Sequence, residues 1–131
     1  MAAKEITKSI DGPNEEAANG KADRGRRVHM ARIKYKTLTE QMFYILLCLR
    51  TECCGIDIME MVSEMTDGRV LLGPGTLYAL LGDFVKQGFI KETAVEGRKR
   101  SYVITDAGEE LLREEYERLR AQVTDFERAQ R

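Results

Sequence analysis

Apolar positions recur at helical spacing in three successive stretches of this chain. The first stretch, 42–49, is apolar on most sides, which is typical of a buried helix. The second stretch, 58–65, and the third, 77–84, each carry an apolar stripe. The pattern therefore predicts three consecutive helices, each with a face that must be covered.

Residues that favour helix ends separate these stretches. Thr39 is a good N-cap for the first helix, and Gly55 interrupts the chain before the second. Gly68 ends the second helix, Pro74 suits the first turn of the third, and Gly88 suits its C-terminal end. The three helices are therefore short and closely connected.

The pattern changes after the third helix. Two short strands are predicted at 89–95 and 100–105, with a turn at Glu96-Gly97 between them. Thr105 then caps a last helix that runs nearly to the C-terminus. The fold class we expect is mainly α with a small β-hairpin, namely a winged helix-turn-helix followed by a long C-terminal helix.

Charge is segregated along the chain, although the net charge is only −1. Residues 24–36 hold six basic residues and no acidic one, and Arg98, Lys99 and Arg100 follow one another near the predicted hairpin turn. Segregated charge guides a polyanion to one face of a protein. The short third helix could enter a DNA major groove, which is about 12 Å wide, while the hairpin cations reach neighbouring phosphates.

We expect three segments along the chain. Residues 1–36 form a polar, then basic N-terminal tail, 37–105 a winged-helix DNA-binding domain, and 106–131 a C-terminal dimerisation helix. The basic stretch 24–36 is either a solvated linker or an arm that reaches along DNA. Neither a secretory apolar region nor a run of about 20 apolar residues is present, so we expect a cytoplasmic protein without a membrane partner.

The sequence contains no catalytic or metal-binding pattern, so we expect neither an enzyme nor a cofactor. His29 is the only histidine, and no nucleophile–base pairing or phosphate-cradling glycine loop is present. Cys48 lies in an apolar run, which favours a buried hydrophobic role. Cys53 and Cys54 do not have zinc-ligand spacing, and two interpretations stay open for them: incidental thiols, or a redox or metal sensor.

Two runs of the chain carry a family resemblance: G-P-G-T-L-Y at 73–78 and G-R-K-R-S-Y-V-I-T-D-A-G at 97–108. They resemble the PadR family of bacterial transcriptional regulators over about residues 38–130, and the single C-terminal helix looks like the smaller subgroup of that family. The resemblance implies a dimeric winged-helix repressor, and many members release DNA on binding a small aromatic or hydrophobic molecule. The chain departs from the family at Gly73, where Ser is usual, and in having no Trp.

The candidate DNA-binding residues lie on the third helix and on the predicted wing. Free backbone N–H groups at a helix start bind phosphate, and nearby hydroxyl groups add hydrogen bonds. The wing cations suit phosphate contacts, although cations also suit a solvated hairpin tip. The predicted set is Gly75, Thr76, Tyr78, Ala79, Lys86, Arg98, Lys99 and Arg100.

The last helix carries apolar residues at steps of four, three, four and three, which predicts a coiled-coil seam. The seam residues are Leu112, Tyr116, Leu119, Val123 and Phe126. We expect the seam to join two chains into a homodimer, with the segment around 33–43 as a further dimer surface. Such a dimer would read double-stranded DNA at a pseudo-palindromic operator, with half-sites about one helical turn apart.

A small aromatic or apolar effector, if there is one, would lodge between the last helix and the three-helix core. The candidate wall residues are Met42, Phe43, Tyr116 and Phe126.

Two other functions are open at this point. A winged helix can act as a protein–protein adaptor, and Cys53 and Cys54 could make the regulator a thiol-based redox sensor. The face that carries Thr76 and Arg98 distinguishes the adaptor from the DNA binder. Cations on that face favour DNA, and an apolar patch there favours a protein partner.

Overall fold

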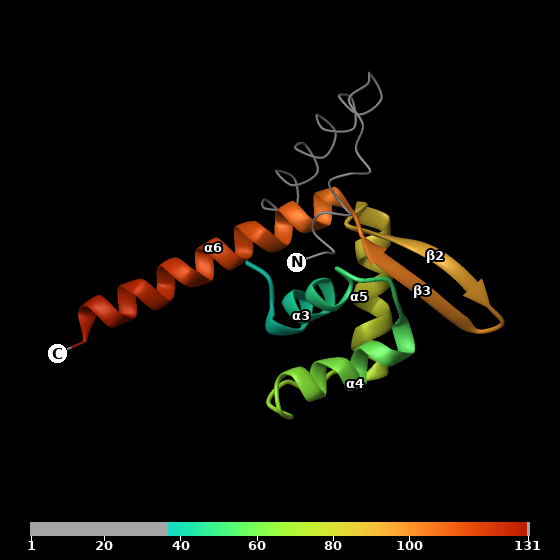
Figure 1. The fold of residues 1–131 in the computed structure, drawn as a ribbon, viewed down its shortest axis with the longest axis horizontal. Helices are drawn as coiled ribbons and strands as arrows, with labels where there is room; N and C mark the ends of the chain where they lie inside the picture. Colours follow the sequence, from blue (N-terminus) through green and yellow to red (C-terminus); the bar gives the residue numbers. More distant parts are fainter. Residues whose placement is uncertain (1–36, 131) are drawn as a thin grey trace, which may run out of the picture.

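A computed structural model describes residues 37–130. The predicted tail 1–36, with its basic stretch 24–36, and residue 131 lie outside the described residues. The elements shown in Figure 1 are α3 (Glu40–Cys48), β1 (Cys53–Cys54), α4 (Gly55–Met65), α5 (Pro74–Gln87), β2 (Ile90–Glu96), β3 (Lys99–Ile104) and α6 (Asp106–Ala129). A search of the described helices finds none that is long and apolar enough to cross a membrane.

The predicted helices are confirmed, together with the predicted ends of α3 and α5 and the predicted start of α6, whereas α4 begins at Gly55 itself and ends at Met65, before Gly68. The Thr39 side chain accepts a hydrogen bond of 3.1 Å from the backbone N–H of Met42 at the start of α3. Gly73 is the N-cap of α5, Pro74 stands in its first turn, and Gly88 closes it in a left-handed conformation. Local signals in the sequence therefore set the limits of α5, the helix that the winged-helix interpretation assigns to the major groove.

The turn between α4 and α5 is held by a buried threonine. The Thr66 hydroxyl donates to the Val62 carbonyl at 2.8 Å and accepts from the Val70 N–H at 3.1 Å. Buried polar groups are normally satisfied in this way, so Thr66 gives the turn a fixed geometry. That geometry sets where α5 begins relative to α4.

The sheet has three antiparallel strands in the order β1-β3-β2, one more than the predicted hairpin. Cys53 and Cys54 form β1 and pair with Tyr102 and Ser101 of β3. A run of two residues is too short to show the alternation by which a strand is recognised in sequence. The added strand joins the segment between α3 and α4 to the wing.

The hairpin turn lies one residue later than predicted. Glu96 pairs with Lys99, which leaves Gly97 and Arg98 as the two turn residues. The φ of Gly97 is +60°, a value that suits glycine at the first central position of a tight hairpin turn. Arg98 therefore stands at the tip of the wing.

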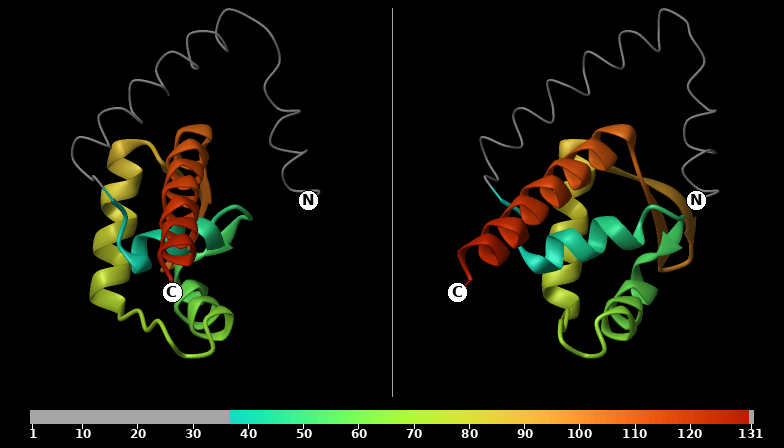
Figure 2. Two further views of the ribbon diagram at one scale, coloured as in Figure 1. Left: turned by 90° about the vertical axis from the view of Figure 1, so that its left-hand side faces the viewer. Right: turned by 60° about the vertical axis from the view of Figure 1, so that its left-hand side comes forward.

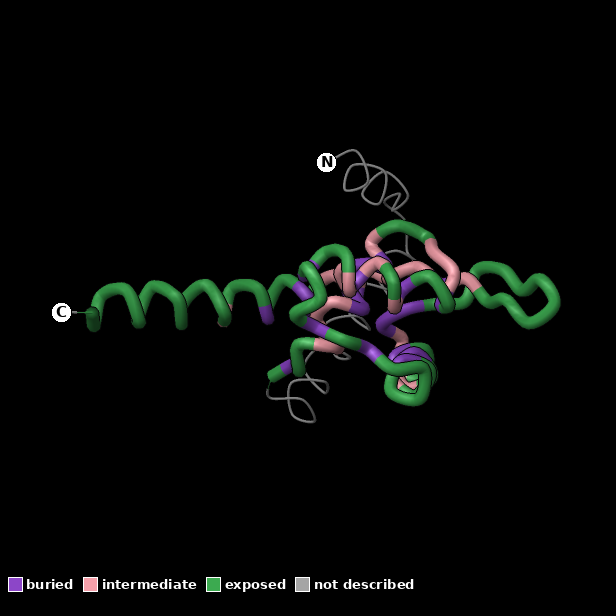
Figure 3. Tube along the Cα trace, turned by 90° about the horizontal axis from the view of Figure 1, so that it is seen from below, coloured by how far each residue is buried: buried purple, intermediate pink, exposed green. Residues whose placement is uncertain are grey.

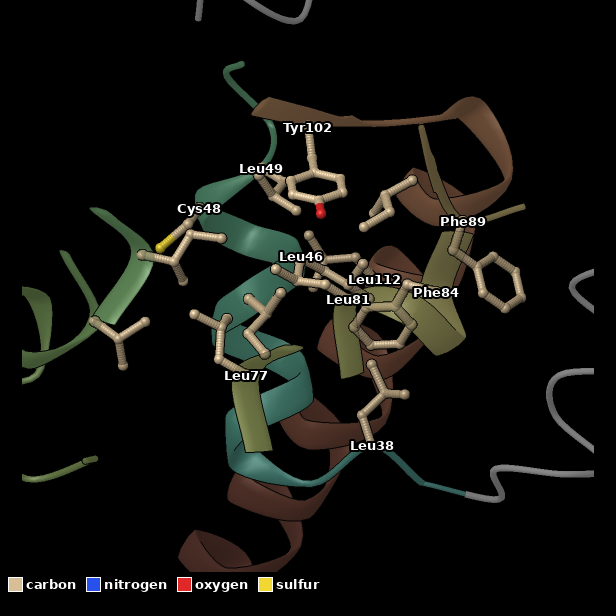
Figure 4. Packing of buried hydrophobic residues seen from close by; sticks show 14 of the residues in the cluster. Leu38, Leu46, Cys48, Leu49, Leu77, Leu81, Phe84, Phe89, Tyr102 and Leu112 are labelled. Atoms are coloured by element: carbon tan, nitrogen blue, oxygen red, sulfur yellow. The ribbon is translucent and has the colours of Figure 1, made fainter. Parts of the chain in front are cut away.

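One hydrophobic core unites the helices, the sheet and the first turns of α6. Figure 4 shows Leu46 of α3, Leu81 and Phe84 of α5, Tyr102 of β3 and Leu112 of α6 directed into the same cluster. α6 packs on α3 and β3 through its N-terminal part and then leaves the core (Figures 1 and 2). The outer part of α6 and the hairpin tip are both exposed (Figure 3).

The end of α5, the end of β3 and the start of α6 meet at Thr105. Its hydroxyl donates to the Gly88 carbonyl at 2.6 Å and accepts from the Gly108 N–H at 3.2 Å, which caps α6. The Thr105 N–H also bonds the Phe89 carbonyl at 3.0 Å. These bonds fix the direction in which α6 leaves the winged helix.

Candidate nucleic-acid interface

α5 presents a smooth exposed face opposite its buried stripe. Its core side chains are Leu77, Leu81 and Phe84. The opposite positions, at steps of four, three and four, are all exposed: Gly75, Ala79, Gly82 and Lys86. Three of these four residues have no side chain beyond Cβ, so another molecule can approach the helix backbone closely. Gly75, Ala79 and Lys86 belong to the predicted DNA-binding set. Gly82 was not predicted, although its spacing from Ala79 could have identified it.

The start of α5 is open to an anion. Gly73 makes no side-chain cap, and the first turn contains no acidic residue. The first backbone bond of the helix runs from the Leu77 N–H to the Gly73 carbonyl at 2.9 Å. The N–H groups of Gly75 and Thr76 precede this bond, and both residues are exposed. The positive end of the helix dipole is thus uncovered at the predicted position.

Helix α5 and the β2–β3 hairpin meet over the start of α4. A Cβ added to Gly55 would lie 3.3 Å from Leu81, 3.4 Å from the Tyr102 ring and 3.5 Å from the Tyr78 ring. Tyr102 is buried, whereas Tyr78 keeps 47% of its surface exposed. Burial raises the pKa of Tyr102, and the neighbouring Glu92 carboxylate raises it further. The packing holds α5 and β3 in one fixed relation, with Tyr78 exposed between them.

The three predicted wing cations are not equivalent. Arg98 and Lys99 are exposed, and no ion pair within residues 37–130 engages either of them. Arg100 forms an ion pair with Glu92, with Nη1 and Oε2 2.8 Å apart. This hydrogen bond is also the main reason why the pKa of Arg100 is raised. Two of the three cations are therefore directly available to a phosphate, and the third is already paired.

The predicted dimer seam begins later than expected. Leu112 is 5% exposed and belongs to the chain's own core. The other four seam residues are exposed, as Figure 3 illustrates for the outer part of α6: Tyr116 44%, Leu119 38%, Val123 56% and Phe126 65%. This placement corrects the prediction for Leu112. The prediction failed because apolar residues at heptad steps have the same spacing whether their side chains face their own core or a partner chain. The remaining apolar seam is 116–126.

The predicted effector walls are not brought together within one chain. Met42 and Phe43 are half-buried on α3 and pack against the core. Tyr116 and Phe126 are ten residues apart on α6 and so are separated by about 15 Å along the helix. The described chain thus does not bring all four residues around one small molecule. An effector site at these residues stays a prediction.

The three cysteines differ in burial, because Cys48 is buried and Cys53 and Cys54 are half-buried. Cys48 is buried in the core, as predicted. The Cys53 Sγ lies 3.7 Å from the Met61 Sδ, and burial, as the largest of several causes, raises the pKa of Cys53 to about 11. A raised pKa lowers the population of the reactive thiolate. No cluster of three or more His, Cys, Asp or Glu side chains suited to a metal occurs in the part of the chain that the structure describes.

Comparison with solved structures places this architecture among known regulators. Bacillus subtilis PadR, solved in complex with operator DNA, is 26% identical, with a TM-score of 0.51 over 57% of this chain and 45% of that chain. A transcriptional regulator from Clostridium thermocellum is 20% identical, with a TM-score of 0.60 over 70% of this chain and 93% of that one. RosR of H. salinarum is 22% identical, with a TM-score of 0.51 over 71% and 96%. The similarity to the regulator from Clostridium thermocellum and to RosR concerns the fold alone.

Comparison with protein families is more specific. No curated protein sequence is significantly similar to this chain. The model of the transcriptional regulator PadR-like family matches residues 45–114, which is more than half of the chain. The matched range runs from α3 to the first turns of α6 and includes both the exposed face of α5 and the wing. The chain belongs to the PadR-like family of transcriptional regulators.

Proposed function

We propose that this chain is a DNA-binding transcriptional repressor that reads a pseudo-palindromic operator as a homodimer. The observation that carries the proposal is the small-residue face of α5 beside a wing with two cations that form no ion pair within residues 37–130. The face suits close approach to base edges, and the cations suit the flanking phosphates. The relative from Bacillus subtilis that was solved with operator DNA supports the same role.

In this proposal the predicted residues other than Arg100 divide the contacts with DNA among them. The N–H groups of Gly75 and Thr76 bind a phosphate at the start of α5. Ala79 faces the base edges, and Tyr78 and Lys86 flank it. Arg98 and Lys99 contact phosphates beyond the major groove. Cations at the wing, instead of an apolar patch, are the reason to prefer DNA over a protein partner.

The dimer would form along the exposed seam 116–126 of α6. A fully buried large apolar side chain contributes about 1.5–3 kcal/mol, and these side chains are already partly covered in the single chain. Association costs about 4–15 kcal/mol, so a seam this short is marginal alone. We therefore propose that the segment around 33–43 of one chain packs against α6 of its partner. A flat, apolar effector bound near this junction would then release the DNA.

DNA titrations with a variant on the α5 face test the proposed function. Ala79→Glu places a carboxylate on an exposed position of α5, and Ala121→Glu makes the same change on exposed α6. Fluorescence anisotropy with a mixed-sequence duplex at several salt concentrations measures binding by the full chain. We expect salt-dependent binding by the wild type and by Ala121→Glu, and a loss of at least tenfold for Ala79→Glu. Equal binding by all three proteins would place DNA elsewhere, and no binding by the wild type would favour the adaptor role.

A further inference from the structure

We propose that Glu92 sets the DNA affinity of the wing by competing with phosphate for the guanidinium of Arg100. The inference rests on the proposed DNA-binding function and deepens it, because it assigns opposing roles to two residues of the same wing. Its basis is the Glu92–Arg100 ion pair, in which Oε2 and Nη1 are 2.8 Å apart. The two side chains are 33% and 57% exposed, so a phosphate can reach the pair.

The strand register places this ion pair on the side of the wing that faces the recognition helix. Glu92 stands directly opposite Tyr102, and Arg100 precedes Tyr102 by two residues on β3. Alternate residues of a strand share a face, so all three side chains project from the same side of the hairpin. Tyr102 on that side and Tyr78 of α5 both border Gly55. Lys99, one residue before Arg100, projects from the opposite side.

A β-bulge fixes Glu92 in this position. The pairing of β2 with β3 shifts by one residue between Glu92 and Ala94, so Thr93 is the extra residue. The Thr93 hydroxyl donates to the Glu52 carboxylate at 2.6 Å, which ties the bulge to the segment before β1. Bulges redirect side chains relative to a regular ladder. Because of the shift, Glu92 and Val95 both share the face of Arg100.

Carboxylate and phosphate are rival ligands for one guanidinium. Arginine binds either anion through the same planar set of donors, and Glu92 already accepts a hydrogen bond from one of them, Nη1 of Arg100. A phosphate that binds Arg100 through Nη1 must displace Glu92, and a phosphate at any other donor of the guanidinium is repelled by the Glu92 charge. Exposed ion pairs are weak, so displacement is feasible at a cost. Arg98 and Lys99 carry no such competitor within residues 37–130 and supply the basal attraction.

The test is a double-mutant cycle on DNA binding by the full chain. Glu92→Gln keeps the size of the side chain and removes the charge that holds Arg100. We expect its affinity for a mixed-sequence duplex to rise about two- to fivefold, the range that an exposed ion pair supports. The log–log salt slope should steepen by about 0.9, because one more phosphate is bound. In an Arg100→Ala background the same substitution should give only a small rise.

Glu96→Gln is the matched control. Glu96 is an exposed carboxylate of the same strand that stands opposite Lys99, on the other side of the hairpin. The Glu96→Gln substitution removes the same charge from the wing without releasing Arg100. The proposal is overturned if Glu92→Gln behaves like the wild type or like Glu96→Gln, or if its gain persists without Arg100. Wild-type chain that fails to bind DNA would instead overturn the proposed function itself.

Discussion

Glycine at position 108 is required by the close approach of α6 to the chain that follows α5. A Cβ at this position would lie 2.1 Å from the Phe89 carbonyl oxygen and 2.7 Å from the Ile104 side chain. The carbonyl belongs to the backbone and accepts the Thr105 N–H at 3.0 Å, so it cannot move without loss of that bond. The spacing T-x-x-G at 105–108 thus has a local cause: Thr105 caps the helix, and Gly108 lets its first turn pack.

We predict that Gly108→Ala destabilises the fold and that Gly82→Ala does not. The first substitution overpacks a buried contact, which costs about 1–3 kcal/mol or more. A Cβ added to Gly82, on the exposed face of α5, would meet no atom within 4 Å. Replacing a helical glycine by alanine at such a position contributes about 0.5–1 kcal/mol of stability. Urea unfolding followed by circular dichroism measures both. Equal midpoints for the two variants would contradict the close approach.

At Cys53 the burial of the thiol has a measurable consequence. An unperturbed cysteine thiol has a pKa of 9.0, and burial together with nearby groups raises the pKa of Cys53 to about 11. In a Cys54→Ser variant, the alkylation rate of Cys53 in the folded chain should reach half of its maximum near pH 11, whereas the same thiol in urea should reach half of its maximum near pH 9. A plateau at or below pH 9 in the folded protein would indicate an activated thiol and would revive the redox-sensing interpretation.

At the scale of elements, local signals made α3, α5 and α6 predictable, because Thr39, Gly88 and Thr105 specify their ends within one turn of chain. The short strand β1 depends on pairing with residues almost fifty positions later, and a two-residue strand has no period of its own. The role of Leu112 likewise depends on what α6 packs against, which no spacing along α6 reveals. The pairing of Arg100 with Glu92 follows from register and a bulge, both of which are non-local.

The wing should contribute phosphate contacts through Arg98 and Lys99, which form no ion pair in the described part of the chain. Arg98→Ala together with Lys99→Ala should lower affinity for all duplex sequences and flatten the log–log salt slope by about 1.8, since each lost phosphate contact removes about 0.9. Arg128→Ala, at the exposed end of α6, is the control for a generic loss of charge. Titration at four salt concentrations gives the slopes. A slope for the double variant that equals that of Arg128→Ala would exclude the wing as a DNA contact.

The outer part of α6 should hold the dimer. Leu119→Asp puts a charge into the seam 116–126, whereas Ala121→Asp puts the same charge on a different side of the helix. Both positions are exposed in the single chain, so the winged helix should stay folded in either variant. Analytical ultracentrifugation should find monomers for Leu119→Asp and dimers for Ala121→Asp. Dimers in both variants would mean that the chains associate through another surface.

At the scale of the whole molecule, the surfaces proposed for DNA reading and for dimerisation lie at opposite ends of a continuous framework. Tyr78 and Tyr102 join α5 to the wing over Gly55, and Thr105 joins the end of α5 to the start of α6. The outer part of α6 then projects away from the core on the side opposite the wing (Figure 1). Two chains joined along α6 would therefore carry their recognition helices at a fixed separation, which is the requirement for reading a repeated site.

Selection of duplexes from a random library by the full-length chain tests this account most directly, since it requires both sequence reading and two-fold symmetry. We predict enrichment of an inverted repeat whose half-site centres lie about 34–36 Å apart, or a multiple of that distance. The Leu119→Asp chain should enrich no paired half-sites. Enrichment by the wild type of a single unrepeated site, or of no sequence at all, would contradict the dimeric operator-binding account.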